Sequence, residues 1–114
     1  MAGRTRKLLR AAAESDNTFE QVSADGRDYL VGKCIHCQTR VTVPLDWNES
    51  AHATLEHIIP RGLGGSDEPD NLAVACQRCN QLKGRRLDRG RRGDEALERV
   101  IEQLQERRRA RTRG

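Results

Sequence analysis

The sequence predicts a small α+β domain that is stapled by two cysteine pairs and flanked by a helix at each end. Three observations predict this class. Two Cys-x-x-Cys pairs are present, short apolar segments alternate with polar loops around them, and an apolar stripe with helical spacing follows. A chain of 114 residues has room for one domain plus tails.

The composition predicts a thin hydrophobic core. Only 35% of the residues are apolar, and Phe, Tyr and Trp occur once each. A short chain with so few large apolar side chains needs a staple, which can be a set of disulfides, a metal ion or a partner subunit.

The cysteines indicate which staple this is. The N-terminus lacks the apolar run of a signal peptide, and no stretch approaches the roughly 20 apolar residues of a membrane span. We therefore expect a cytoplasmic location and no membrane partner, and disulfides are rare in that reducing compartment. The two pairs thus favour a structural Zn²⁺ site, with two disulfides or a redox-active pair as alternatives. Its ligands would be Cys34, Cys37, Cys76 and Cys79.

The positive charge is concentrated beyond the second cysteine pair. Residues 1–84 carry 10 basic and 11 acidic side chains, whereas residues 85–114 carry 11 basic and 6 acidic ones. This asymmetry favours a polyanionic partner, and nucleic acid is the most plausible one. Solvated helix faces are the alternative reading.

The first half of the chain predicts a helix and a hairpin. Residues 3–15 are rich in helix formers, and residues 16–28 have the composition of a polar loop, with a turn at Asp25-Gly26. The strand-like segments 29–31 and 40–43 flank the first cysteine pair, which predicts a zinc knuckle at the tip of a hairpin.

The second half predicts a strand, a loop, a strand and a helix. Residues 53–59 form an apolar segment that ends at Pro60, and a glycine-rich loop follows to Asn71. Residues 72–76 predict a second strand and residues 78–87 a helix, with the second cysteine pair at the helix entrance. Trp47 is expected in the core or in a lid.

The C-terminal region predicts a further helix. Asp94 is suited to be its N-cap, and four apolar residues recur at positions i, i+3, i+4 and i+7: Leu97, Val100, Ile101 and Leu104. We expect this stripe to pack on the domain, with dimerisation as the alternative. Residues 107–113 have the composition of a mobile basic tail. The predicted divisions are a basic N-terminal arm or short helix (1–18), the central domain (19–88), and a linker with a basic C-terminal helix and tail (89–114).

Three residues of the central segment suit the hydrolysis of a phosphodiester bond. A neutral histidine such as His57 can accept a proton from the attacking water at pH 7. A divalent cation can stabilise the negative charge that develops, and Glu56 and Asn80 offer the oxygen ligands that such a cation prefers. Regular strand geometry sends Glu56 and His57 to opposite faces, so the strand must end or distort near Pro60.

The segment "LEHIIPRGLGGSDEPDNLAVACQRCNQLKG" resembles the HNH endonuclease motif of the ββα-metal (His-Me finger) fold, in the branch with two Cys-x-x-Cys pairs. The resemblance covers residues 34–84. It includes Pro60, Gly64-Gly65, Asp70-Asn71-Leu72, and the Cys-x-x-Cys-Asn-x-x-Lys run that ends at Lys83. The two arms lie outside it.

This resemblance implies a role for each motif residue. His57 would be the general base, Glu56 and Asn80 would hold one catalytic Mg²⁺ or Mn²⁺, and Asn71 would brace the loop and orient His57 through the backbone. The cysteines would hold a structural zinc with no open position. Glu56 stands where Asp is common, and Asn80 stands where the motif's name has histidine, and we expect activity to be retained.

The implied function is cleavage of DNA by a phage or bacterial nuclease, alone, as a homodimer, or with a partner protein such as a phage packaging component. Plausible phosphate contacts are Arg61, Lys83, Arg85 and Arg86, although they can also be ordinary solvated charges. A non-catalytic zinc module that binds nucleic acid or protein is the main alternative, and a thiol-disulfide protein is the second.

Two further histidines are not expected to take part. His36 lies between two cysteines, and the middle residues of a knuckle are usually exposed, so we leave it out of the site. His52 is expected to be structural.

Overall fold

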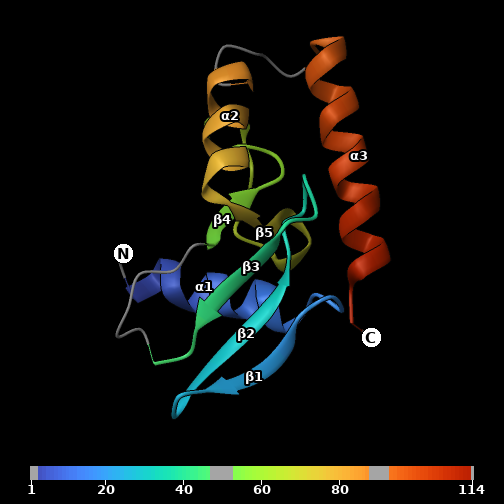
Figure 1. Cartoon of the computed structure of the whole chain (residues 1–114). Coiled ribbons are helices and arrows are strands. Elements are labelled where there is room, and N and C mark those ends of the chain that lie inside the picture. Colours follow the sequence, from blue (N-terminus) through green and yellow to red (C-terminus); the bar gives the residue numbers. More distant parts are fainter. Residues whose placement is uncertain (1–2, 47–52, 88–92, 114) are drawn as a thin grey trace.

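The structure is a computed structural model that describes residues 3–46, 53–87 and 93–113. Two small antiparallel sheets and three helices make up the domain (Figure 1), which confirms the α+β class. The strands are β1 (Glu20–Ala24), β2 (Arg27–Lys33), β3 (Arg40–Pro44), β4 (Ala53–His57) and β5 (Leu72–Cys76). The helices are α1 (Gly3–Glu14), α2 (Gln77–Leu87) and α3 (Glu95–Arg111), and two short 3-10 turns, Arg61–Leu63 and Pro69–Asn71, lie in the β4–β5 loop.

The first sheet has the order β1-β2-β3, and its β2–β3 hairpin carries the first cysteine pair at its tip, as predicted. The polar loop predicted for residues 16–28 is wrong in part, because β1 lies within it and pairs with β2. All five side chains of β1 are exposed, so this edge strand has no apolar alternation that could identify it. The turn at Asp25-Gly26 is confirmed, and the positive φ angles of these two residues, 52° and 76°, suit a tight hairpin turn.

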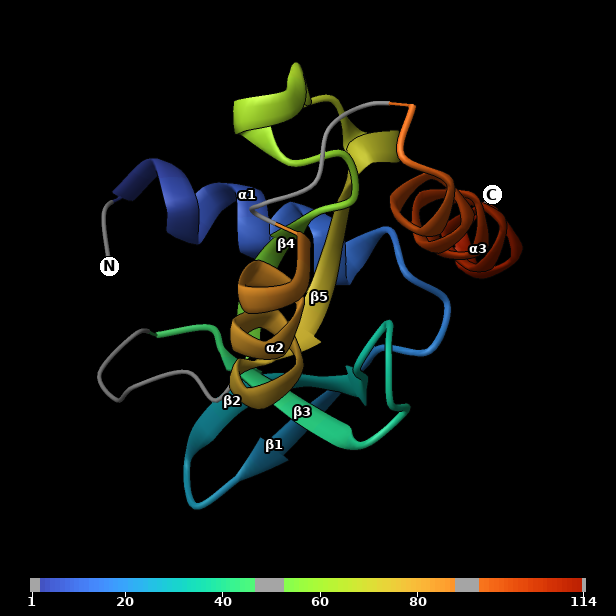
Figure 2. The same cartoon turned by 90° about the horizontal axis from the view of Figure 1, so that it is seen from above.

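The second sheet is the β4–β5 hairpin, which forms the centre of the domain. Residues 72–75 of β5 are all buried. One side of this hairpin is covered by α1, through Leu9, Ala12 and Ala13, and α2 lies on the other side (Figures 1 and 2). This arrangement buries the hairpin on both faces, which explains why β5 is apolar at successive positions rather than at alternate ones.

The C-terminal helix α3 packs on the domain. The Asp94 side chain caps it by accepting a hydrogen bond from the Leu97 N–H at 3.1 Å. Leu97, Ile101 and Leu104 are buried in the same core as β5, and Val100 packs against that core. The predicted cap and the predicted packing of the stripe are therefore both confirmed.

The expectation of a mobile tail at residues 107–113 is wrong. Helix α3 continues to Arg111, and the side chains of Arg108 and Arg111 are buried. Arg108 donates to the carbonyl of Leu72 at 2.8 Å, and Arg111 donates to the carbonyl of Lys33 at 3.1 Å. These arginines pair with backbone oxygens of the domain, a role that composition cannot distinguish from that of a solvated tail.

Trp47 and His52 lie outside the described residues. Over the part of the chain that the structure describes, no helix is both long enough and apolar enough to cross a membrane.

Candidate active site

The four cysteines converge from the two halves of the predicted motif. Cys34 and Cys37 lie at the tip of the β2–β3 hairpin, Cys76 ends β5, and Cys79 lies in the first turn of α2. All four are free thiols, and their sulfur atoms lie within 4.8 Å of one another. The Cys37 and Cys76 sulfurs are 3.8 Å apart. Ligands of tetrahedral zinc at about 2.3 Å have nearly this separation, so the cluster could hold a zinc ion.

The surroundings shift the thiol pKa values in opposite directions, because burial disfavours a thiolate at Cys34 and Cys79 whereas hydrogen bonds favour one at Cys37. Backbone N–H groups of His36 and Cys76 donate to the Cys34 sulfur at 3.4 and 3.3 Å. Hydrogen bonds from the side chain and backbone of Thr39 lower the pKa of Cys37 to about 6. Burial, together with the adjacent thiols, raises the pKa of Cys79. A divalent cation would remove this conflict, because it stabilises all four negative charges together.

Glu56 is a buried carboxylate whose described partner comes from the knuckle. It is 1% exposed, and its Oε2 lies 2.6 Å from Nε2 of His36. The expectation that His36 would be exposed is wrong, since its side chain is only 19% exposed. The knuckle folds against β5, where the Ile35 N–H donates to the carbonyl of Val74 at 2.9 Å, and this contact carries His36 inward. A buried carboxylate needs such a partner.

His57 has a different set of neighbours. Both Glu56 and His57 belong to β4, which ends at His57, so strand alternation sends the two side chains to opposite faces. Nε2 of His57 lies 2.7 Å from Oδ1 of Asp67, a residue of the β4–β5 loop. Nε of Arg61 lies 3.1 Å from the same histidine nitrogen. An imidazole with a carboxylate partner on one nitrogen can accept a proton on the other.

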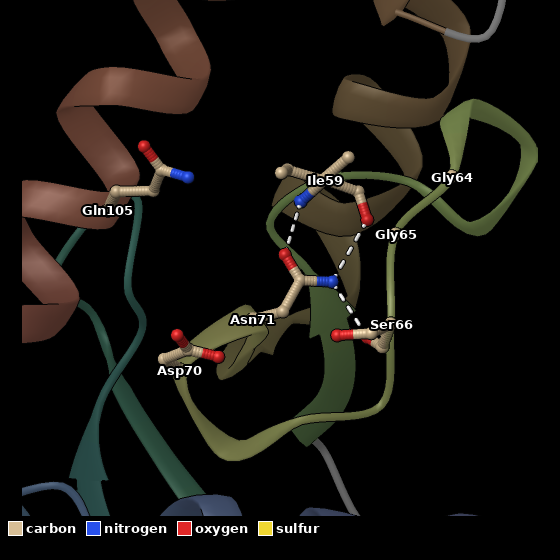
Figure 3. Close-up of a pocket in the computed structure, with 7 residues that line it drawn as sticks. All are labelled: Ile59, Gly64, Gly65, Ser66, Asp70, Asn71 and Gln105. Atoms are coloured by element: carbon tan, nitrogen blue, oxygen red, sulfur yellow. Dashed lines mark hydrogen bonds between the residues drawn. The ribbon is translucent and has the colours of Figure 1, made fainter.

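Asn71 braces the loop that begins after His57, as Figure 3 shows. Its side-chain oxygen accepts from the Ile59 N–H at 2.8 Å, and its amide group donates to the carbonyls of Ile59 and Ser66 at 3.1 and 2.8 Å. The loop passes close to itself at Gly65, where a Cβ atom would lie 1.7 Å from the Ile59 oxygen. Only glycine fits there. The hollow in Figure 3 lies between this loop and Gln105 of α3.

The remaining predicted residues lie on α2 and in the loop. Asn80 is half-buried in the first turn of α2, directly after Cys79, and α2 packs on β4 and β5. Arg61 is exposed, but its guanidinium also pairs with Asp67 at 2.8 Å. Lys83, Arg85 and Arg86 belong to α2, and their side chains lie outside the described residues.

Two residues of this site had no distinctive signal in the sequence. The contact between His36 and Glu56 could have been predicted only from knowing that the knuckle folds back on the sheet. Asp67 lies in a loop rich in glycine and polar residues, where aspartate is common for turn formation alone. Its position ten residues after His57 gives no periodicity that could pair the two.

The chain was also compared with known protein families. A family model described as HNH endonuclease matches residues 34–93, which is more than half of the chain. The matched range includes both cysteine pairs, Glu56-His57, Asn71 and Asn80. No curated protein and no solved structure is significantly similar to the chain.

Proposed function

Because this chain belongs to the HNH endonuclease family, we propose that it is a metal-dependent endonuclease that hydrolyses phosphodiester bonds of DNA. The observation that carries the proposal is β4, whose buried Glu56 contacts His36 of the knuckle and whose His57 contacts Asp67 of the loop. Helix α2, which carries Asn80, packs on the same hairpin. A buried carboxylate, a histidine with a carboxylate partner and a helix-entry amide supply the groups that this hydrolysis requires.

His57 acts as the general base. It takes a proton from a water molecule while the water oxygen forms a bond to phosphorus. The bond between phosphorus and the leaving 3′ oxygen breaks, and that oxygen takes a proton from solvent. Asn71 supports this step indirectly, because it holds the backbone of Ile59, two residues beyond His57. Such bracing keeps the base at a fixed distance from the reacting water.

Glu56 and Asn80 are the residues that would hold a catalytic Mg²⁺ or Mn²⁺. A carboxylate and an amide carbonyl are the oxygen donors that these cations accept, and the burial of Glu56 favours a bound cation over a solvated one. When bound, the ion stabilises negative charge on the phosphoryl and leaving oxygens. His36 turns its Nε2 toward the same carboxylate, so it must move or share Glu56 when a cation enters.

The cysteine cluster has a structural role in this proposal. Four thiolates fill the tetrahedral coordination of zinc and leave no position for water or substrate. Zinc would then fix the entrance of α2, and with it Asn80, against the hairpin that carries His36. Four cysteines gathered for a metal also support a cytoplasmic location, because thiols persist in a reducing compartment.

The proposed contacts to the phosphate backbone are Arg61, Lys83, Arg85 and Arg86. The charge distribution predicts that the C-terminal arm binds the DNA backbone. For residues 107–113 we do not propose this role, because four arginines there donate to backbone carbonyls of the domain: Arg107, Arg108, Arg111 and Arg113. Binding should still weaken steeply with salt. One site cuts one strand, so a double break needs a second copy or a partner protein.

The test is incubation of the purified protein with supercoiled plasmid in Mg²⁺, Mn²⁺ or EDTA, beside His57→Ala. We expect nicked or linear DNA with the wild type and a divalent ion, and none with His57→Ala or EDTA. If neither protein cuts with any metal while both still shift DNA in a gel, the chain is a zinc module that binds nucleic acid without cleaving it.

A further inference from the structure

Asp67 is the centre of a charged cluster on the loop side of the site. Its Oδ1 lies 2.7 Å from His57 Nε2, and the Arg61 guanidinium lies 2.8 and 3.0 Å from its two oxygens. A second guanidinium, from Arg4 of α1, lies 2.7 Å from Oδ2. The loop carboxylate therefore joins the histidine at the end of β4 to the N-terminal helix.

Asp67 is ionised in this cluster. Hydrogen bonds from Arg4, His57 and Arg61 hold the pKa of its carboxyl group well below the usual range. An ionised carboxylate can only accept hydrogen bonds. The 2.7 Å contact with His57 therefore requires a proton on Nε2, and in the neutral ring the lone pair then belongs to Nδ1.

Arg61 offers a competing arrangement at the same nitrogen. Its Nε–H group can donate to Nε2 of His57 only when that nitrogen carries no proton. That contact is 3.1 Å long, whereas the contact between Nε2 and the carboxylate is 2.7 Å long. The guanidinium also has Asp67 itself as a partner. The shorter, charge-assisted bond is the stronger one, so the proton belongs on Nε2.

We propose that Asp67 is a positioning residue, which holds His57 in the tautomer protonated at Nε2, and that Arg4 holds Asp67 in place for this role. The consequence for cleavage rests on the proposed function, whereas the tautomer does not. In the neutral ring, Nδ1 then carries the lone pair. Arg4 keeps the carboxylate paired when Arg61 turns to a phosphate group. Since Arg4 lies outside residues 34–93, the N-terminal helix is a part of the site as well as of the core.

The direct test is nitrogen-15 NMR of the histidine rings in the full zinc-loaded chain, at a pH where the rings are neutral. The signals of His57 are assigned by their loss in His57→Gln. Protonated and unprotonated ring nitrogens are resolved in such spectra, so the tautomer is read without DNA or cleavage. The variants are Asp67→Ala, which removes the acceptor, and Asp67→Asn, which keeps an acceptor oxygen without its charge. Glu68→Gln is the matched control, since Glu68 is an exposed carboxylate next to Asp67.

We expect the Nε2-protonated tautomer to predominate in the wild type and in Glu68→Gln, to lose its majority in Asp67→Ala, and to be partly kept in Asp67→Asn. In the plasmid assay, Asp67→Ala should lower kcat by about ten- to a hundredfold, the range seen when the partner of an active-site group is removed. The KM should change much less, because Asp67 itself does not bind DNA.

Unchanged zinc content and an unchanged melting temperature will show that Asp67→Ala is folded. A wild-type ring protonated at Nδ1, or a tautomer ratio that Asp67→Ala leaves unchanged, overturns the proposal. A wild type that cuts no DNA but shows the expected tautomer and its loss in Asp67→Ala overturns only the nuclease assignment.

Discussion

Glu56 and His57 are adjacent in β4, and the domain surrounds their side chains in opposite ways. Glu56 is buried and is paired with a histidine that comes from the knuckle. His57 is part-exposed and is paired with an aspartate that comes from a loop. We call these contacts the knuckle-side pair (Glu56 and His36) and the loop-side pair (His57 and Asp67). Each pair joins an acid to a histidine. In the knuckle-side pair β4 supplies the acid, and in the loop-side pair β4 supplies the histidine.

The supports behind the two pairs differ as well. The knuckle-side pair is backed by the cysteine cluster, since His36 lies between Cys34 and Cys37. The loop-side pair is backed by two arginines whose side chains are 71% and 60% exposed. The difference teaches that one strand can present a buried carboxylate and a part-exposed histidine at successive positions. We therefore expect changes on the knuckle side to lower stability more than changes on the loop side do.

Loss of the metal ligands should have the largest effect. Structural zinc contributes apparent binding free energies of about 10–16 kcal/mol in zinc-finger peptides, and a typical domain is stable by only about 5–15 kcal/mol. Cys79→Ser, or removal of zinc with a strong chelator, should therefore leave the domain largely unfolded at room temperature. Circular dichroism and zinc content measure this outcome. A sharp, unchanged thermal transition without zinc would show that the knuckle side does not depend on the metal.

Glu56→Ala and His57→Ala compare the pairs directly. Glu56→Ala leaves His36 without its partner beside a buried gap, and the unpaired group and the cavity together should cost about 2–4 kcal/mol. His57→Ala, at a part-exposed site, should cost about 1 kcal/mol. Urea denaturation measures both, and the plasmid assay should show loss of cleavage in both. Equal losses of stability would contradict the distinction between a buried knuckle-side pair and a part-exposed loop-side pair.

Arg107→Ala should weaken the knuckle side by an intermediate amount. The Arg107 guanidinium donates to the carbonyls of Ile35 and His36 at 2.6 and 3.1 Å, so it closes the knuckle from outside. Loss of these bonds should lower the free energy of unfolding by about 1–2 kcal/mol. The control is Arg109→Ala, an exposed arginine two residues on in the same helix, which should change it by less than about 0.5 kcal/mol. Similar losses of stability in both variants would mean that the positive charge of the helix stabilises the domain, and not these two hydrogen bonds.

Arg4→Gln should have the smallest effect of the four. Arg4 is 71% exposed, and exposed ion pairs contribute little. Melting temperature should barely change, and the cleavage rate should fall by at most about fivefold at low salt. At about 1 M salt, where the Debye length is about 3 Å, the difference in rate should disappear. A salt-independent loss of rate would indicate that Arg4 acts by packing, and Lys7→Gln on the same helix is the control.

Much of this architecture could be predicted from local sequence. The cysteine pairs, the two apolar strands and the Asp94 cap each have a signal within a few residues, and all are confirmed. The exposed strand β1 has no such signal, because none of its side chains is buried. The partners of Glu56 and His57 could not be predicted either, since His36 and Asp67 reach them only through the folding of a knuckle and a loop. The buried arginines were misread because their partners are carbonyls, which every residue has.

The attachment of residues 107–113 has a consequence for the order in which the chain can fold. Arg113 donates to the carbonyls of Asp16 and Phe19 at 3.2 and 2.6 Å, its backbone N–H donates to Ser15, and Thr112 forms a β-bridge with Asp16. Domains begin to fold during synthesis, but contacts between such distant segments can form only after the last of them has left the ribosome. The contacts of the knuckle and the N-terminal helix with the C-terminal arginines therefore form last. In the cell, the end of α3 would therefore dock on the rest of the domain only after residue 113 has left the ribosome.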